Sequence, residues 1–324
     1  MCDCNLSDIS FLEQTPILEK LDLSYNNIED ISILKKLKQI KSLDLSHNKI
    51  KNIDVLSDFQ EFLDLNIESN LIEDISALRN IKFEEELFIG QNRIMDLTPL
   101  YFELKRGKFF LNHFDNPIIY PPKEYERLPE NIKLEWFENV IENCNKKIQE
   151  IKENRGTALD LGMMGLTDLS LIPELFELEN LEELILSNVW AQFNKDTNKW
   201  EPIFSENDFY INNLMNIPND IIKLKKLKVL IAGGDWKKDN KWNRWRLSDI
   251  SFINKLDNIE FVNLSNNKIN SFNITRNLNE LKTLHINNNF IKSISISRAK
   301  NIEYLFASNN FIEDVNFLKK SLSL

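Results

Sequence analysis

The strongest constraint on this 324-residue chain is a pair of apolar residues, two positions apart, that returns every 22 residues. The pairs begin at Leu21, Leu43, Leu65, Leu87 and Phe109. An asparagine stands five residues after each of the first four starts, at Asn26, Asn48, Asn70 and Asn92, and an isoleucine follows it two residues later. In the fifth copy Phe114 takes the place of the asparagine. This period predicts stacked coils, because one coil cannot bury its apolar side chains alone.

A second series of pairs occupies the later part of the chain. Its members begin at Leu159, Leu184, Leu230, Val262, Leu284 and Leu305. The last two steps are 22 and 21 residues, whereas the earlier steps of 25, 46 and 32 residues indicate coils that carry insertions. The asparagine position is filled by Asn267, Asn289 and Asn310 in the last three copies.

Between the two series, apolar residues change to helical spacing. Trp136, Val140, Cys144 and Ile148 recur every four residues and predict a helix that ends at Gly156. We therefore expect three parts: a first repeat array at 1–118, a helical connector or cap at 119–155, and a second array at 156–324. Because strand side chains alternate, each apolar pair predicts a short strand with two inward side chains. The predicted fold is an α/β solenoid, a horseshoe with a parallel β-sheet on its concave face and two arrays joined by the helical segment.

The segments "LKQIKSLDLSHNKI" and "LDNIEFVNLSNNKI" resemble the leucine-rich repeat pattern, and the coil "N-x-I-x-D-I-S-x-L" is similar to its 22-residue subclass. The segment "NPIIYPPKEY" resembles the end of the leucine-rich region of bacterial Roco proteins. The segments "LDLGMMGLTDL" and "IPNDIIKLKKLKVL" resemble the beginning of such a region. The resemblance implies a bacterial, cytoplasmic regulatory module. It implies no GTPase, since the chain has no G-x-x-x-x-G-K-[S/T] loop.

Composition restricts the function further. The net charge of −10 argues against nucleic-acid binding, which needs clustered lysine and arginine. No apolar run approaches the roughly 18 residues that span a membrane, and the first residues do not form a secretory signal. Three cysteines favour a reducing compartment, and hence the cytoplasm, over a disulfide framework. The histidines lie on distant coils, so we expect no metal, no cofactor and no enzymatic activity.

The residues that alternate with the inward leucines should face outward on the concave sheet and form the candidate partner-binding surface. In the first array these are Asp22, Asp44, Asn66, Phe88 and Phe110, a row that runs from acidic to aromatic. In the second array they include Phe261, His285, Tyr304 and Phe306. Aromatic clusters on such a face are typical of partner sites, and the acidic end favours a basic partner segment. The alternative is that neighbouring side chains or an insertion cover them.

The insertions of the second array are rich in tryptophan. Trp190 and Trp236 each stand six residues after the start of a pair, and Trp242 and Trp245 follow close behind. These tryptophans either fasten the insertions to one edge of the solenoid or form a ligand-binding rim along that edge.

The sequence as a whole predicts a non-enzymatic module that binds a protein partner through its concave face. One alternative is head-to-tail self-association. The phrase "LSDISF" occurs at Leu6–Phe11 and Leu247–Phe252 in the same phase of the repeat, so the first coil is expected to begin half complete, and both ends of the stack are expected to be open. Another alternative is a regulatory subunit of an enzyme such as a GTPase or a phosphatase.

Overall fold

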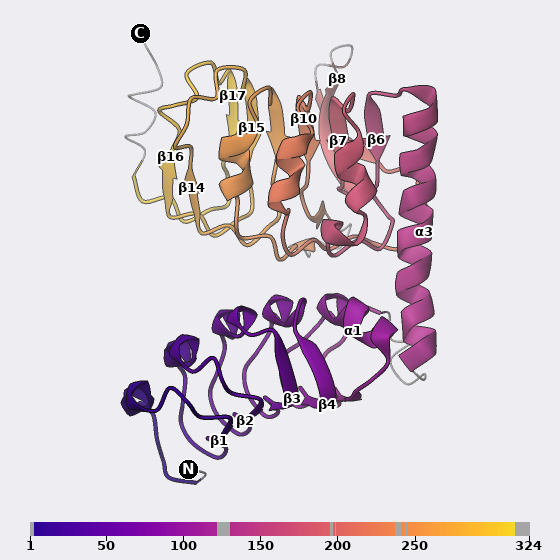
Figure 1. The fold of residues 1–324 in the computed structure, drawn as a ribbon. Coiled ribbons are helices and arrows are strands. Elements are labelled where there is room, and N and C mark those ends of the chain that lie inside the picture. The colour runs from indigo at the N-terminus through magenta and orange to yellow at the C-terminus, as the bar shows by residue number, and fades with distance from the viewer. Residues whose placement is uncertain are drawn as a thin grey trace. The chain divides into compact units, whose positions relative to one another are not determined.

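The computed structural model describes residues 3–121, 130–194, 197, 199–236, 242–243 and 245–314. It divides into two compact units, Met1–Glu138 (unit 1) and Asn139–Leu324 (unit 2), and each contains stacked coils with a parallel sheet (Figure 1). The boundary falls inside helix α3 (Glu130–Asn154). The expected division at 118 and 155, the horseshoe curvature and the joining role of the helix stay predictions.

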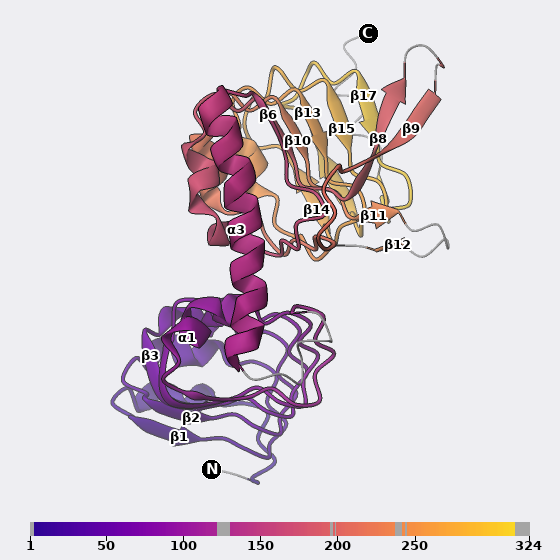
Figure 2. The ribbon, with the colours of Figure 1, turned by 90° about the vertical axis from the view of Figure 1, so that its right-hand side faces the viewer.

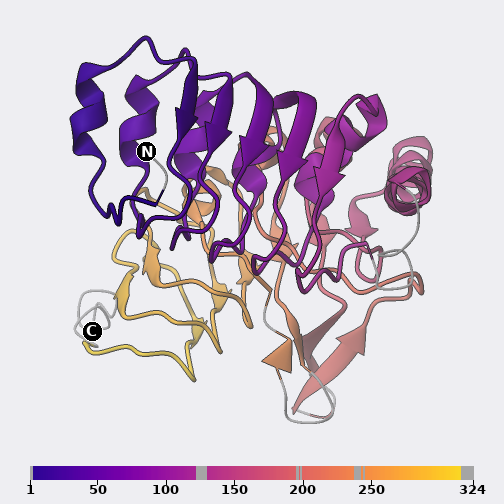
Figure 3. The ribbon, with the colours of Figure 1, turned by 90° about the horizontal axis from the view of Figure 1, so that it is seen from below.

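Within residues 3–121, the sheet of unit 1 has the order β1-β2-β3-β4-β5, and all neighbours are parallel. The strands are β1 (Lys20–Asp22), β2 (Ser42–Asp44), β3 (Glu61–Asn66), β4 (Lys82–Phe88) and β5 (Phe110–Asn112). The other side of the coils carries η1 (Ser10–Gln14), η2 (Ser32–Lys36), η3 (Asp54–Asp58), η4 (Ser76–Leu78), η5 (Thr98–Leu100) and α1 (Tyr101–Arg106), as Figure 3 shows. The inward leucines Leu21, Leu43, Leu65 and Leu87 are in register and buried.

The fifth coil of unit 1 corrects the expected register. Leu111 pairs with Leu87, in the position that the predicted series gave to Phe109, so this step is longer by two residues. The extra length accompanies α1, which follows the short turn η5. The asparagine position belongs to Asn116, whose Nδ2 donates to the carbonyl of Ile89 at 2.9 Å, and not to Phe114. The repeat therefore continues as far as Asn116.

The sheet of unit 2 has the order β17-β15-β13-β10-β7-β6 and is parallel throughout. Its strands are β6 (Ala158–Asp160), β7 (Glu183–Ile185), β10 (Val229–Ile231), β13 (Phe261–Asn263), β15 (Thr283–His285) and β17 (Tyr304–Phe306). Further elements are η6 (Leu169–Leu171), η7 (Pro173–Glu177), η8 (Asn219–Lys223), η9 (Ser251–Lys255), and the parallel pair β14 (Ser271–Asn273) and β16 (Ser293–Ser295). The registers confirm all six predicted apolar pairs of the second series.

A ladder of buried asparagines links each coil to the one before it. Asn48 donates through Nδ2 to the carbonyl of Leu23 at 2.9 Å and to that of Leu45 at 3.0 Å, and its Oδ1 accepts from the amide of Ile28 at 2.9 Å. The donation to the preceding coil recurs at Asn70, Asn92, Asn116, Asn267, Asn289 and Asn310. The Oδ1 contact recurs at Asn70, Asn92, Asn116, Asn289 and Asn310. The amide thereby satisfies backbone groups that leave the sheet in the interior, where an unpaired group is costly.

The coil of β7 has its asparagine on the far side of an insertion. The hairpin β8 (Val189–Asn194) and β9 (Lys199–Phe204) leaves the coil at this point (Figure 2), and its base is closed where the Ser205 amide donates to the Asn188 carbonyl at 3.0 Å. Asn212 then donates to the carbonyls of Leu161 and Leu186, both at 2.7 Å. The insertion therefore lengthens the coil without breaking the ladder.

The next coil places Trp245 where its neighbours have asparagine. The Trp245 amide donates to the Asn266 carbonyl at 2.9 Å, as the Asn26 amide donates to the His47 carbonyl at 3.2 Å. The Trp245 side chain is fully buried, and Nε1 has no hydrogen-bond partner within the described residues. Trp245 is thus a core residue, so the expectation that it could line a ligand-binding rim was wrong.

Helix α3 buries its apolar residues in both units. In unit 1, the rings of Trp136 and Tyr120 have centroids 6.0 Å apart, and those of Phe137 and Tyr101 are also 6.0 Å apart. In unit 2, Cys144 is buried with its neighbours along the helix, and burial raises the pKa of its thiol to about 12. The expected helix is confirmed as an element that packs against repeat coils, and Cys144 is a core residue.

Candidate protein-binding faces

The outward side of strands β3, β4 and β5 in unit 1 forms a regular grid, which we name the β3–β5 face. Each row crosses the three strands, and successive rows are two residues apart along a strand because side chains alternate between the two faces of a sheet. The rows are Asp64–Glu86–Phe110, Asn66–Phe88–Asn112 and Glu68–Gly90–Phe114. The face therefore joins carboxylates on β3 and β4 to aromatic side chains on β4 and β5.

The aromatic part of this face is unusually open. Phe110 is 56% exposed and Phe114 is 69% exposed, and the ring of half-buried Phe88 lies 5.9 Å from that of Phe110. The register places Phe110 in the first row of the grid, because Asn112 holds the middle position for which Phe110 was predicted. Rings held on a sheet offer a large apolar area with little conformational freedom to lose on binding.

The acidic side chains of the first coils are engaged with their own backbone. Asp22 Oδ1 accepts from the Ser24 amide at 2.9 Å, and Asp44 Oδ1 accepts from the Ser46 amide at 2.8 Å. Asn66 Nδ2 donates to Asp44 Oδ2 at 3.1 Å. The hydrogen bond from the Ser24 hydroxyl is the main cause that lowers the pKa of Asp22. Asp22 and Asp44 therefore stabilise the backbone where the strands end. Their carboxylates also place negative charge on the outward side of the sheet.

The sheet of unit 2 carries a second aromatic group, which we name the His285 cluster. It consists of Phe261, His285, Tyr304 and Phe306, on β13, β15 and β17. The His285 ring lies 4.3 Å from the Phe306 ring and 5.3 Å from the Phe261 ring. Tyr304 is 55% exposed at the same side of the sheet, whereas His285 is only 4% exposed. His285 is therefore the buried floor of the cluster, and the half-buried phenylalanines and exposed Tyr304 form its surface.

Burial in this cluster lowers the pKa of His285 to about 4. The unfolded chain binds a proton at this histidine near its ordinary pKa of about 6.5, while the folded chain stays neutral down to about pH 4. The unfolded state therefore binds more protons in that window, so acidification from pH 7 to pH 4 destabilises unit 2. In the His285→Gln variant, we expect the decrease in the free energy of unfolding between pH 7 and pH 4 to be smaller by about 2–3 kcal/mol. Denaturant unfolding at several pH values measures this difference.

His47→Gln is the matched control, since His47 lies in a loop of unit 1 and stacks on Tyr25 at 4.0 Å. This variant should keep the acid sensitivity of unit 2. If His285→Gln loses as much stability between pH 7 and pH 4 as the unchanged protein, His285 is not held neutral in the fold.

The tryptophan-rich insertions lie at the strand-exit edge of the unit 2 coils. Trp190 is half-buried in β8, opposite Ile203 of β9. Trp236 and Trp242 pair across β11 (Asp235–Trp236) and β12 (Trp242–Asn243), but their side chains lie outside the described part of the structure. The predicted rim of Trp190, Trp236 and Trp242 stays a prediction, and Trp245 has no place in it.

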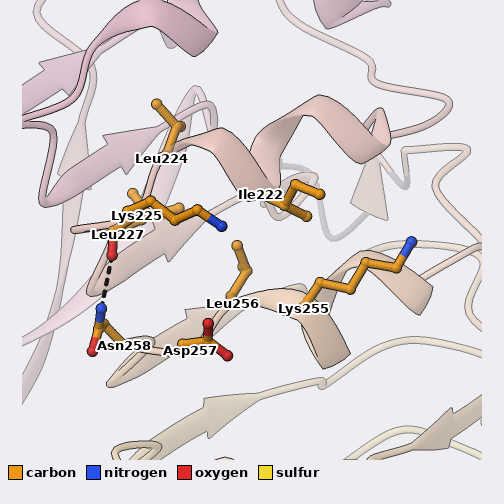
Figure 4. Close-up of a pocket in the computed structure, with 8 residues that line it drawn as sticks. All are labelled: Ile222, Leu224, Lys225, Leu227, Lys255, Leu256, Asp257 and Asn258. Atoms are coloured by element: carbon orange, nitrogen blue, oxygen red, sulfur yellow. Dashed lines mark hydrogen bonds between the residues drawn. The ribbon is translucent and has the colours of Figure 1, made fainter.

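The described residues enclose a small cavity in unit 2, and unit 1 has a more open depression of about 430 Å³ beside Asp30, Ser32 and Asp54. Figure 4 shows a cavity of about 10 Å³ between two coils of unit 2, where Asn258 Nδ2 donates to the Lys225 carbonyl at 2.7 Å. That volume holds about one water molecule. Among the described residues, no three His, Cys, Asp or Glu side chains gather to hold a metal ion.

The helices within the described residues include none with the length and apolar character needed to cross a membrane.

Comparison with known families identifies the repeat. The model named "Leucine Rich repeats (2 copies)" matches residues 16–58 and 279–320. Leucine-rich repeats are therefore present in both units. No curated protein matches the chain.

Several solved structures match this chain at low similarity. An internalin of Listeria monocytogenes is 19% identical, covers 100% of this chain and 84% of its own length, with a TM-score of 0.34. A leucine-rich repeat protein of Leptospira interrogans is 20% identical, with 97% and 67% coverage and a TM-score of 0.37. The Arabidopsis receptor kinase HAESA, in complex with the peptide hormone IDA and the co-receptor SERK1, is 18% identical, with 93% and 44% coverage and a TM-score of 0.33.

Proposed function

We propose that this leucine-rich repeat protein is a non-enzymatic module that binds a protein partner through the outward faces of its two parallel sheets. The observation that carries the proposal is the exposure of large aromatic side chains in sheet strands, Phe110 in unit 1 and Tyr304 in unit 2. Aromatic side chains dominate binding energy at protein interfaces, and a sheet holds them in fixed positions.

The charge of unit 1 supports a partner with a basic segment. Asp22, Asp44, Asp64, Glu68 and Glu86 lie on the outward side of the sheet, and Asp64 and Glu86 share a row with Phe110. Opposite charge speeds the encounter of two proteins and selects among partners. An aromatic anchor beside the charges supplies the apolar contact that charge pairs at a wet surface do not give.

The resemblance to the leucine-rich region of bacterial Roco proteins supports a regulatory or scaffolding role in the cytoplasm of a bacterium. Self-association and service as a regulatory subunit of an enzyme such as a GTPase or a phosphatase are the alternatives. Light scattering against concentration separates the first of them, because a chain that stays monomeric does not assemble head to tail.

The test is affinity capture with wild type beside the quadruple variant Phe88→Ser, Phe110→Ser, Tyr304→Ser and Phe306→Ser. We expect capture of a partner to fall at least tenfold with the variant, because each serine removes an apolar contact from the sheet. Circular dichroism and thermal unfolding establish that the variant is folded.

The matched control replaces two exposed phenylalanines that lie outside the sheets, Phe11 and Phe102, by serine. It should capture the partner as wild type does. Equal capture by the folded quadruple variant would contradict the proposal and direct attention to the insertion edge of unit 2.

A further inference from the structure

The first residues of five neighbouring strands form an accessible row across the sheet of unit 2. In β10, β13 and β15 the third residue is buried, whereas the first residue of each strand is half-buried. The strand registers place the first residues side by side. We name this row the unit 2 track, and its members in order are Glu183, Val229, Phe261, Thr283 and Tyr304. The track therefore begins with a carboxylate on β7 and ends with the exposed ring of Tyr304 on β17.

The carboxylate at the start of the track differs from the acidic side chains beside it. Glu182, directly before β7, accepts from Lys228 Nζ at 2.7 Å, and Glu260, directly before β13, accepts from Lys282 Nζ at 3.0 Å. The lysines at this end of the strands are therefore engaged in ion pairs. Within the part of unit 2 that the structure describes, no cation or hydrogen-bond donor pairs with the half-buried Glu183 carboxylate.

A second carboxylate makes this end of the track more strongly negative. Asp160 lies on the neighbouring strand β6, and its oxygens accept from the Gly162 amide at 2.8 Å and from the Ser205 hydroxyl at 2.9 Å. Burial, and then the negative charge of Asp160, raise the pKa of Glu183. The fold thus holds Glu183 in surroundings that disfavour its charged form. A positive charge beside it favours that form, so a cationic side chain gains more here than at a fully exposed carboxylate.

Apolar side chains continue the track away from the two carboxylates. Val229 follows Glu183 in the row and Phe261 follows Val229, while half-buried Phe306 lies beside Tyr304 on β17. Neighbouring strands lie about 4.8 Å apart, so the track is about 19 Å long from Glu183 to Tyr304. A segment lying along it meets negative charge at one end and apolar surface over the rest.

We propose that the unit 2 track binds an extended segment of a protein partner, in which a basic residue on Glu183 is followed by apolar residues at alternate positions as far as Tyr304. This inference rests on the proposed function and adds the order of the residues in the partner. Side chains on one face of an extended segment are about 6.8 Å apart, so three such steps match the length of the track. The charge pair fixes the position of the segment, and the apolar side chains supply the contact area.

The test uses the full chain and a synthetic peptide, acetyl-GKSLSLSFG-amide, which has lysine and three apolar residues at alternate positions. Calorimetric titration measures its affinity, and the amide resonances of Glu183, Phe261 and Tyr304 in NMR spectra should shift as it binds. Acetylation of the lysine side chain removes the charge and should weaken binding at least fivefold. The peptide acetyl-GLSKSLSFG-amide has the same composition with the lysine away from Glu183, and it should also bind at least fivefold less tightly.

Two variants report on the two ends of the track. Glu183→Gln should weaken binding of the lysine peptide at least fivefold and leave binding of the acetylated peptide unchanged, because only the first peptide has a charge to lose. Tyr304→Ser should weaken binding of both peptides. Glu174→Gln removes the same charge from an exposed position in η7, outside the sheet, and should leave binding unchanged, which separates a local contact from the net charge. Thermal unfolding confirms that each variant is folded.

The outcomes separate this inference from the proposed function. Absence of shifts along the track, or equal binding of the lysine peptide by folded Glu183→Gln and wild type, overturns the inference. Self-association of the chain that Glu183→Gln weakens, without binding of the peptide, overturns it as well and makes a second copy the occupant. The proposed function then still stands if partner capture is lost with the quadruple aromatic variant, and it fails if capture is unchanged, whatever the peptide does.

Discussion

Replacing Trp245 by alanine is expected to lower the free energy of unfolding of unit 2 by about 3–5 kcal/mol. The side chain is fully buried in the position that the other coils give to asparagine, so its loss leaves a cavity between neighbouring coils. Denaturant unfolding, followed by tryptophan fluorescence and circular dichroism, measures the effect. Alanine cannot replace the indole, because it neither fills the cavity nor supplies an amide group that would join the ladder of hydrogen bonds.

Two substitutions control this result. Trp245→Phe should cost only about 1 kcal/mol, because it keeps most of the ring volume and removes the buried Nε1 that has no partner within the described residues. Trp190→Ala, at a half-buried position in β8, should cost less than Trp245→Ala. A loss below about 1 kcal/mol for Trp245→Ala would show that the indole does not fill the core.

Replacing Asn70 by alanine is expected to destabilise unit 1 by about 3 kcal/mol. Asn70 Nδ2 donates to the carbonyls of Leu45 at 3.0 Å and Ile67 at 3.2 Å, and its Oδ1 accepts from the Ile50 amide at 3.0 Å. Alanine leaves these buried backbone groups without a partner, and each unpaired group costs about 1–3 kcal/mol. Hydrogen exchange provides the local measurement, with faster exchange expected at the amide of Ile50.

Asn80→Ala is the matched control, because Asn80 is exposed in the same unit. Its effect should stay within about 0.5 kcal/mol. If both alanine variants unfold at the same denaturant concentration, the buried asparagines are not what holds neighbouring coils together.

The 22-residue period predicted most of the strands and most of the buried asparagines, because residues one period apart contact each other on adjacent coils. Leu21, Leu43, Leu65 and Leu87 pair as expected, and the asparagine after each of them joins the ladder. An inward leucine needs a similar neighbour on the next coil, and a buried amide needs backbone partners at a fixed offset. Both requirements act between adjacent coils, so they are visible in the sequence as a constant step.

The fifth coil was misread because two patterns competed over the same residues. Extending the 22-residue step gave Phe109 and Phe114, whereas the chain uses Leu111 and Asn116 after the additional residues of α1. The segment from Leu111 to Ile118 retains the spacing of leucine, asparagine and isoleucine and could have corrected the step. The shift brings Asn112 and Phe114 to the β3–β5 face.

The insertions of unit 2 prevented the prediction of two further positions in the ladder, Asn212 and Trp245. Asn212 stands far from the leucine pair at Leu184, so no short pattern connects it to the ladder. Trp245 fills an asparagine position by size instead of by hydrogen bonding, and local sequence cannot show that exchange. The exposure of Phe110 depends on how the neighbouring strands pack, so it becomes visible only in the folded chain.

The insertion between Asn188 and Asn212 has a further consequence for the diversification of this scaffold. Strands β7 and β10 keep an unshifted register although the chain between them contains a complete hairpin, because the hairpin leaves and re-enters the coil at a closed base. The strand exit is therefore a graft position, where foreign loops of different length and chemistry can be installed while the sheet is preserved. A library built there would vary the insertion edge of unit 2 while the register of its sheet is kept.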